Sequence, residues 1–201
     1  MSDLKYEVAP TTLSTKENDM HANFRQWTDF LRELGSNTVQ HTDKTYLAHV
    51  IGVYRDMEAD GCNEELCRAG MFHSIYGTER FQHFALPLSR RADVRALIGE
   101  RAERLAYWNC AMDRASFDEA FLRGAVPYRF RDRLNGEFVD VSQEDFADLC
   151  KIHLYDWLEQ VPRSQEWGYR REVYRRMARE LGDVAWKSYE RVFAGETVAQ
   201  G

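Results

Sequence analysis

The segment 66–72 is apolar on nearly every side and ends at a histidine, a combination that limits how this chain can fold. A helix with so little polar surface must pack inside other helices. His73 and Ser74 follow in its expected last turn, and Gly77 is expected to end the helix. Because burying an imidazole without a partner is costly, His73 needs either a hydrogen-bond partner or a metal ion.

The bulk composition predicts one globular domain over residues 1–201, since 44% of the 201 residues are hydrophobic. A net charge of -6 without a basic block argues against nucleic-acid binding. The chain contains no apolar run that spans a bilayer, and its first ten residues lack an apolar signal region. Four cysteines without a CxxC pair indicate reduced thiols. We therefore expect a cytoplasmic protein that binds neither nucleic acid nor a membrane, and homo-oligomer formation is left open.

Apolar residues recur at helical spacing through most of the chain, which predicts an all-α bundle of seven or eight helices. The expected helices cover residues 14–34, 43–60, 63–76, 90–111, 116–123, 142–161 and 166–193, the last with a break at Gly182. Their expected N-caps include Ser14, Asp43, Asn63, Ser89, Ser116 and Ser142. Pro162 is expected to end the long sixth helix, and residues 80–89 are expected to form a loop over a polar cluster.

Residues 126–142 carry the one clear β signal of the sequence. Asn135 and Gly136 form the dipeptide favoured in type I′ hairpin turns, and strand-like residues flank it on both sides. Because a two-stranded ribbon cannot build a core alone, we expect this hairpin to lie against the helices.

Three polar residues stand in otherwise apolar helical patterns, namely His49, His73 and Asp156. His49 lies early in one expected helix and His73 late in the next, so antiparallel packing brings them face to face. Asp156 comes from a much later helix and is in a position to close the set. Two imidazoles and a carboxylate suit a divalent transition metal with positions left for water or substrate. The alternative is a pair of hydrogen-bonded buried histidines, with Asp156 exposed or paired with an arginine.

Over residues 36–161 the pattern resembles the HD-domain superfamily of all-α metalloenzymes. On that likeness His49 matches the first histidine of the motif, His73 the histidine of the HD dipeptide, and Asp156 within YDWLEQ the closing aspartate. The segments AGMFHSIYGTE and IGERAERLAY are also similar to a poorly characterised family of HD-like proteins. The resemblance implies an HD-like core at 36–161, a loose lead-in at 1–13 and a C-terminal helical extension at 162–201.

The chain departs from the HD motif at the dipeptide, because Ser74 replaces the aspartate. A neutral hydroxyl is a weaker ligand than a carboxylate, which argues most strongly against a two-metal site. The basic residue that often follows the dipeptide is also missing. Side chains that could replace the lost ligand are Glu79, His41, His83 and His153.

The resemblance implies an enzyme that acts on a small molecule, most simply by hydrolysis of a phosphoester-type substrate by a metal-activated water, with Mn, Fe or Zn held by His49, His73 and Asp156. Glu79 or His41 would act as general acid or base. Ser74, Tyr76 and Thr78 would line the substrate pocket.

Two alternatives remain open at this stage. One is an iron-dependent oxygenase, for which His41, His83 or His153 must join the same ion. The other is a non-catalytic protein that binds a ligand or partner, for which Ser74 is the best argument.

Overall fold

The computed structural model describes residues 15–36, 38–41 and 44–196, which form a helical bundle with two small sheets. Within these residues there are nine α-helices, one 3₁₀ turn and four short strands. The first half of the chain contains α1 (Thr15–Glu33), β1 (Gln40–His41), β2 (Lys44–Thr45), α2 (Tyr46–Ala59), α3 (Glu64–Met71), η1 (Leu88–Arg90) and α4 (Arg91–Ile98). The second half contains α5 (Glu100–Ala111), α6 (Arg114–Arg123), β3 (Tyr128–Arg131), β4 (Phe138–Val141), α7 (Gln143–Ser164), α8 (Arg171–Glu180) and α9 (Asp183–Phe193).

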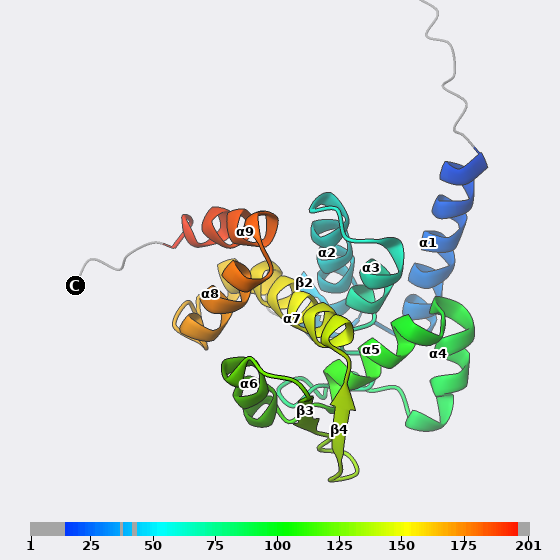
Figure 1. Cartoon of the computed structure of the whole chain (residues 1–201). Helices are drawn as coiled ribbons and strands as arrows, with labels where there is room; N and C mark the ends of the chain where they lie inside the picture. The colour runs from blue at the N-terminus through cyan, green and yellow to red at the C-terminus, as the bar shows by residue number, and fades with distance from the viewer. Residues whose placement is uncertain (1–14, 37, 42–43, 197–201) are drawn as a thin grey trace, which may run out of the picture.

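Helix α7 runs through the middle of the molecule and organises the other elements (Figure 1). It packs against α2, α3 and α5 as well as against α8 and α9. Because it is covered on several sides, residues around its whole circumference are buried, including Leu149, Ile152, Leu154 and Val161. The all-α fold class predicted from helical periodicity is therefore confirmed.

Helix N-termini were predicted with mixed success. Asn63 and Ser142 cap α3 and α7 as expected, each accepting a hydrogen bond from the backbone N–H three residues later. The predicted cap of α2, Asp43, lies outside the described residues, and the cap in the structure is Thr45. For α6 the cap is Asp113 rather than Ser116, because the Asp113 carboxylate accepts from the Ser116 N–H at 2.8 Å. Ser14 also lies outside the described residues.

The expected helix at 90–111 is two helices, and the described residues contain nine α-helices where seven or eight were predicted. Gly99 has a φ of 93° and ends α4 before α5 begins. Glycine adopts this conformation readily and other residues do not, so the direction of the chain changes here. Ser89 does not cap α4, since it lies inside the preceding 3₁₀ turn.

Two further details of the sequence prediction were wrong. Pro162 does not end α7, which continues to Ser164 with the proline in its last turn. The hairpin loop is longer than a two-residue type I′ turn, because Arg131 pairs with Phe138 across six intervening residues. Asn135 does not adopt a positive φ, and its side chain instead accepts the Glu137 N–H at 2.9 Å.

Helix α3 is shorter than predicted and ends at Met71, so His73 lies in the turn that follows it. The prediction that this segment is buried is confirmed, because Leu66, Met71 and Phe72 are at most 1% exposed. Because His73 lies in a turn, a contact from outside α3 helps to fix its backbone.

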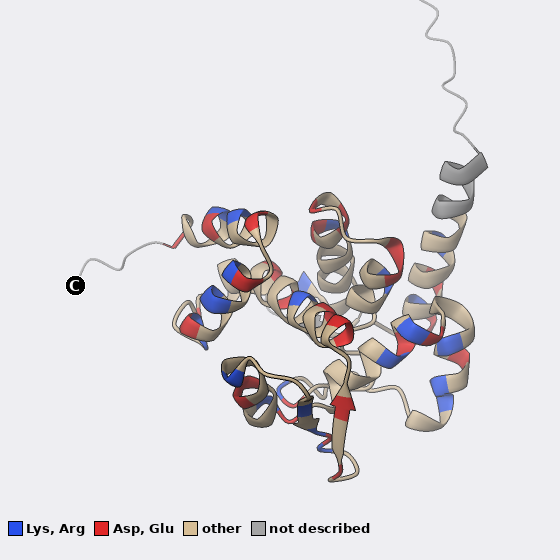
Figure 2. Cartoon of the chain, viewed as in Figure 1, with Lys and Arg blue, Asp and Glu red and all other residues tan. Residues whose placement is uncertain are grey.

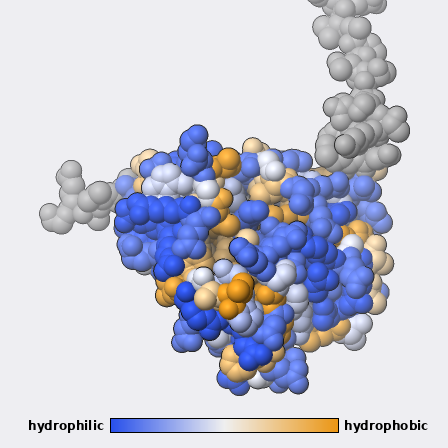
Figure 3. Space-filling view, in the orientation of Figure 1, coloured by the Kyte–Doolittle hydropathy of each residue, from blue (hydrophilic) through white to orange (hydrophobic). Residues whose placement is uncertain are grey.

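Acidic and basic residues are interspersed along the helices (Figure 2). The face shown in Figure 3 is mostly hydrophilic, with hydrophobic residues in separate small patches. Among the helices of the described part of the chain, none is both long enough and apolar enough to cross a membrane.

Candidate metal centre

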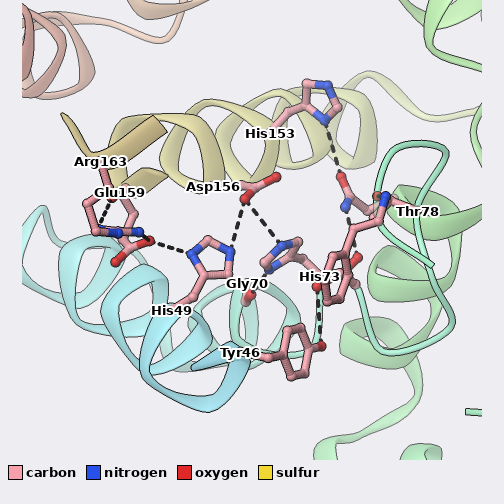
Figure 4. Close-up of polar contacts among 12 residues, drawn as sticks. Tyr46, His49, Gly70, His73, Thr78, His153, Asp156, Glu159 and Arg163 are labelled. Carbon is pink, nitrogen blue, oxygen red and sulfur yellow. Dashed lines mark hydrogen bonds and ion pairs between the residues drawn. The ribbon is translucent and has the colours of Figure 1, made fainter. Parts of the chain in front are cut away.

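His49 lies one turn into α2 and is fully buried against α7. Its Nδ1 contacts the Glu159 carboxylate, and its Nε2 lies 3.1 Å from Oδ1 of Asp156 (Figure 4). Asp156 and Glu159 are three residues apart on α7 and therefore share one face of that helix. One carboxylate thus faces each ring nitrogen of His49.

His73 lies in the turn after α3 and is 2% exposed. Its Nδ1–H donates to the carbonyl oxygen of Gly70 at 2.7 Å, which leaves Nε2 directed towards Asp156 at 3.4 Å. The turn itself is held from α5, since the Asn109 side chain donates to the His73 carbonyl at 2.8 Å. Both the ring and the backbone of His73 are therefore fixed by hydrogen bonds.

Among the described residues, His49, His73 and Asp156 form the one group of three or more His, Cys, Asp or Glu side chains that lie close enough together to hold a metal ion. One ligand atom from each residue lies within 4.8 Å of the others. The two histidine rings are 5.2 Å apart and nearly perpendicular, with both Nε2 atoms towards the same carboxylate oxygen (Figure 4). Two bonds of about 2.1 Å at a tetrahedral angle place ligand atoms about 3.4 Å apart, close to these contacts.

The charges of the cluster support one another. Burial disfavours the His49 imidazolium, yet hydrogen bonds to Asp156 and Glu159 hold the pKa of His49 above its ordinary value. Burial alone raises the pKa of the Asp156 carboxyl, but the charge of His73 and bonds to both histidines hold that pKa well below its usual range. Without a metal, the cluster is therefore a network in which the Asp156 carboxylate and the two imidazoles stabilise one another.

A cavity of about 360 Å³ opens beside the cluster. His73 and Asp156 form part of its wall, whereas the fully buried His49 does not. Ser74, Thr78 and Arg114 line the same space. A small molecule in this cavity would therefore meet the exposed side of the cluster.

The three residues predicted to line a substrate pocket lie in different places. Ser74 and Thr78 line the cavity, and the Ser74 hydroxyl donates to the Tyr46 hydroxyl at 3.2 Å. Tyr76 does not line it, because its hydroxyl donates to the buried Glu103 carboxylate at 2.9 Å. Ser74 is therefore a wall residue and not part of the ligand cluster.

Of the two predicted acid–base residues, Glu79 is not part of the cluster. Glu79 lies in the segment between α3 and η1 and is exposed. Its carboxylate accepts a hydrogen bond from the backbone N–H of Arg114, the first residue of α6, at 3.1 Å. The side chain of His41 lies outside the described residues. His83 lines the cavity without joining the cluster, and His153 accepts hydrogen bonds from two arginines instead.

Sequence reasoning missed Glu159 and Gly52, which together support His49. A Cβ atom added at Gly52 would lie 2.7 Å from Oε1 of Glu159 and 3.0 Å from its Cγ. Glu159 is anchored by Lys44 and Arg163 as well as by His49, so it has little room to move. The signal was present, because each residue lies three positions after a predicted ligand on the same helix.

Gly52→Ala is expected to weaken both the fold and the metal centre. Alanine normally stabilises a helix by about 0.5–1 kcal/mol relative to glycine, but here the clash should give a net loss of about 1–3 kcal/mol. Displacing Glu159 from His49 should also lower metal affinity about 10-fold or more. Denaturant unfolding and metal titration measure the two effects.

Gly168→Ala is the matched control, because an added Cβ there meets no atom within 4 Å. A Gly52→Ala protein as stable as the control variant would show that Glu159 is not held tightly against α2.

A family model described as a domain of unknown function, DUF6817, matches residues 30–114. This range contains His49 and His73 but neither Asp156 nor Glu159, which lie on α7. No curated protein matches the chain. No solved structure matches it either.

Proposed function

We propose that this protein is a metal-dependent hydrolase that acts on a small phosphoester-type substrate, with one divalent ion held by His49, His73 and Asp156. When bound, such an ion supplies a water of lowered pKa as a nucleophile at neutral pH. The resemblance to the HD-domain superfamily supports phosphoester chemistry, and the cavity beside the cluster gives a small substrate access to it.

The observation that carries this proposal is how the two imidazoles are held. In each ring Nδ1 is taken by an acceptor, the Glu159 carboxylate for His49 and the Gly70 carbonyl for His73. A histidine that ligates a metal through Nε2 almost always donates its other N–H to a carboxylate or carbonyl, which fixes its tautomer and orientation. Both rings therefore present Nε2 to the same point, where Asp156 adds a carboxylate oxygen.

The residues around the cluster have different roles in this proposal. Glu159 and the Gly70 carbonyl orient the imidazoles and raise their basicity. Ser74 and Thr78 offer hydroxyl groups to a substrate in the cavity. The packing of α2, α3 and α7 excludes water from the far side of the cluster, where His49 is fully buried.

An iron-dependent oxygenase is the second candidate, since two histidines and one carboxylate with open positions are typical of non-haem Fe(II) oxygenases. The two-iron version needs more nitrogen ligands. Neither His83 nor His153 joins the cluster in the described residues, which favours a single ion.

Metal titration of the purified protein tests the proposal. After removal of metal and chelator, Mn, Fe(II) or Zn should bind with a stoichiometry of one per chain. Binding should then restore hydrolysis of a generic phosphoester such as p-nitrophenyl phosphate or its bis-ester. Oxygen consumption that depends on Fe(II), without phosphoester turnover, would favour the oxygenase.

A protein that binds none of these ions would exclude both enzymatic candidates. The cluster would then be a hydrogen-bonded network that contributes only to stability, as in a non-catalytic protein with this fold.

A further inference from the structure

Arg114 is the first residue of α6 and extends into the cavity wall beside His73 and Asp156. Its backbone N–H donates to the Glu79 carboxylate, but no carboxylate in the described part of the chain pairs with its guanidinium. The guanidinium instead donates through Nη1 to Nε2 of His153 at 2.5 Å.

His153 does not balance the positive charge of Arg114, because an imidazole is either neutral or positive. It is fully buried, and burial together with the guanidinium groups of Arg114 and Arg170 holds its pKa well below the ordinary value. Its Nε2 accepts from both arginines, and its Nδ1 faces the Asn109 side-chain oxygen at 3.3 Å. The imidazole is thus a neutral spacer between two cations.

Arg170 differs from Arg114 because it has its own counter-charge. The two oxygens of Asp118 accept from its Nε and Nη2, and its Nη1 also donates to the Tyr174 hydroxyl at 3.0 Å. Two guanidinium groups therefore contact His153, and of the two only that of Arg170 is paired with a carboxylate among the described residues. The excess positive charge belongs to Arg114, whose buried Nε has no hydrogen-bond partner among the residues described.

We propose that the Arg114 guanidinium binds an oxyanion of the ligand, a phosphate or a carboxylate group, in the cavity that His73 and Asp156 also line. Arginine suits this role because its planar group makes parallel, charge-assisted hydrogen bonds to two oxygens of one anion. A partly buried cation without a counter-charge also attracts an anion more strongly than a solvated one does. The identification of that ligand as the substrate rests on the function proposed above, whereas anion binding by Arg114 does not.

Anion titration of the metal-free protein, with the chelator also removed, tests this inference. Inorganic phosphate and acetate are titrated separately into the wild type, Arg114→Gln and Arg123→Gln, with affinity read from calorimetry or thermal shift. Loss of a charge-assisted pair should weaken binding of at least one anion about 10- to 100-fold in Arg114→Gln. Arg123→Gln, an exposed arginine at the other end of α6, should bind as the wild type does.

Arg114→Lys covers the case in which Arg114→Gln does not fold. It keeps the charge but loses the planar two-point contact, so affinity should fall by a smaller factor, about 3- to 10-fold. Wild-type affinity in both folded Arg114 variants, or no binding of either anion to the wild type, would overturn the inference.

The two proposals can fail independently. Arg114-dependent anion binding in a protein that takes up no metal would support the anion site and reject the hydrolase. A protein that binds metal but holds both anions equally well in wild type and Arg114→Gln would do the reverse.

Discussion

Asp156→Asn should abolish metal binding while leaving the protein folded. The carboxylate is the one anionic ligand of the cluster and contacts both Nε2 atoms, so its neutral amide should lower metal affinity by more than about 100-fold. In the wild type, metal at about 100 times its Kd adds about 2.7 kcal/mol to the free energy of unfolding. For a chain of this length that raises Tm by about 5–10 °C, and Asp156→Asn should show no such rise.

The matched control for this experiment is Glu144→Gln, an acid on the same helix whose side chain is 82% exposed. It should keep the full metal-dependent shift. If Asp156→Asn shows the same shift as this control, the metal does not bind between His49 and His73, and the proposed centre is wrong.

Glu159→Gln should give the largest loss of stability among single substitutions near the site. The Glu159 side chain is 5% exposed and contacts Lys44, His49 and Arg163. Removing its charge leaves these basic groups without their shared counter-charge, and breaking a buried pair of this kind costs about 3 kcal/mol. Denaturant unfolding of the metal-free protein measures this loss.

The loss should depend on pH in a way that identifies its cause. Burial raises the pKa of Glu159, but His49, Arg163 and Lys44 hold it below the ordinary value of 4.5. Its stabilisation is therefore present above pH 4.5 and disappears as pH falls through the lowered pKa. The pKa of His49 lies above 6.5, so its contribution is complete below that pH and disappears as pH rises through the raised pKa.

The difference between wild type and Glu159→Gln should consequently be largest between about pH 5 and 6.5, and it should narrow on both sides. Glu172→Gln, whose side chain is 83% exposed, should show little change at any pH. A Glu159→Gln difference that does not vary with pH would mean that lost packing, and not lost charge, explains the effect.

The helical part of this fold was predictable because its cause is local. Apolar spacing and a side-chain cap determine where a helix forms, so α3 begins after Asn63 and α7 after Ser142, as expected. Errors occurred where one backbone conformation decides the outcome. The positive φ of Gly99 splits a helix that periodicity alone reads as continuous.

Helix packing put His49 and His73 within reach of each other, as the sequence order of two consecutive helices predicted. The final position of His73 was not predictable, because it lies in a turn held by the Asn109 side chain from α5. The spacing of Glu159, three residues after Asp156, was visible in the sequence, but only the rotation of α7 against α2 directs that carboxylate to His49.

The sequence by itself determined the helices and the buried setting of the two histidines. Tertiary structure alone decided which atoms of those side chains meet, that Arg114 enters the cavity without a counter-charge, and that Tyr76 and Glu79 do not enter it. The physical reason is the separation along the chain over which each kind of interaction acts. Helix propensity and capping act over a few neighbouring residues, whereas a shared metal or anion site depends on how helices far apart in the chain rotate and pack.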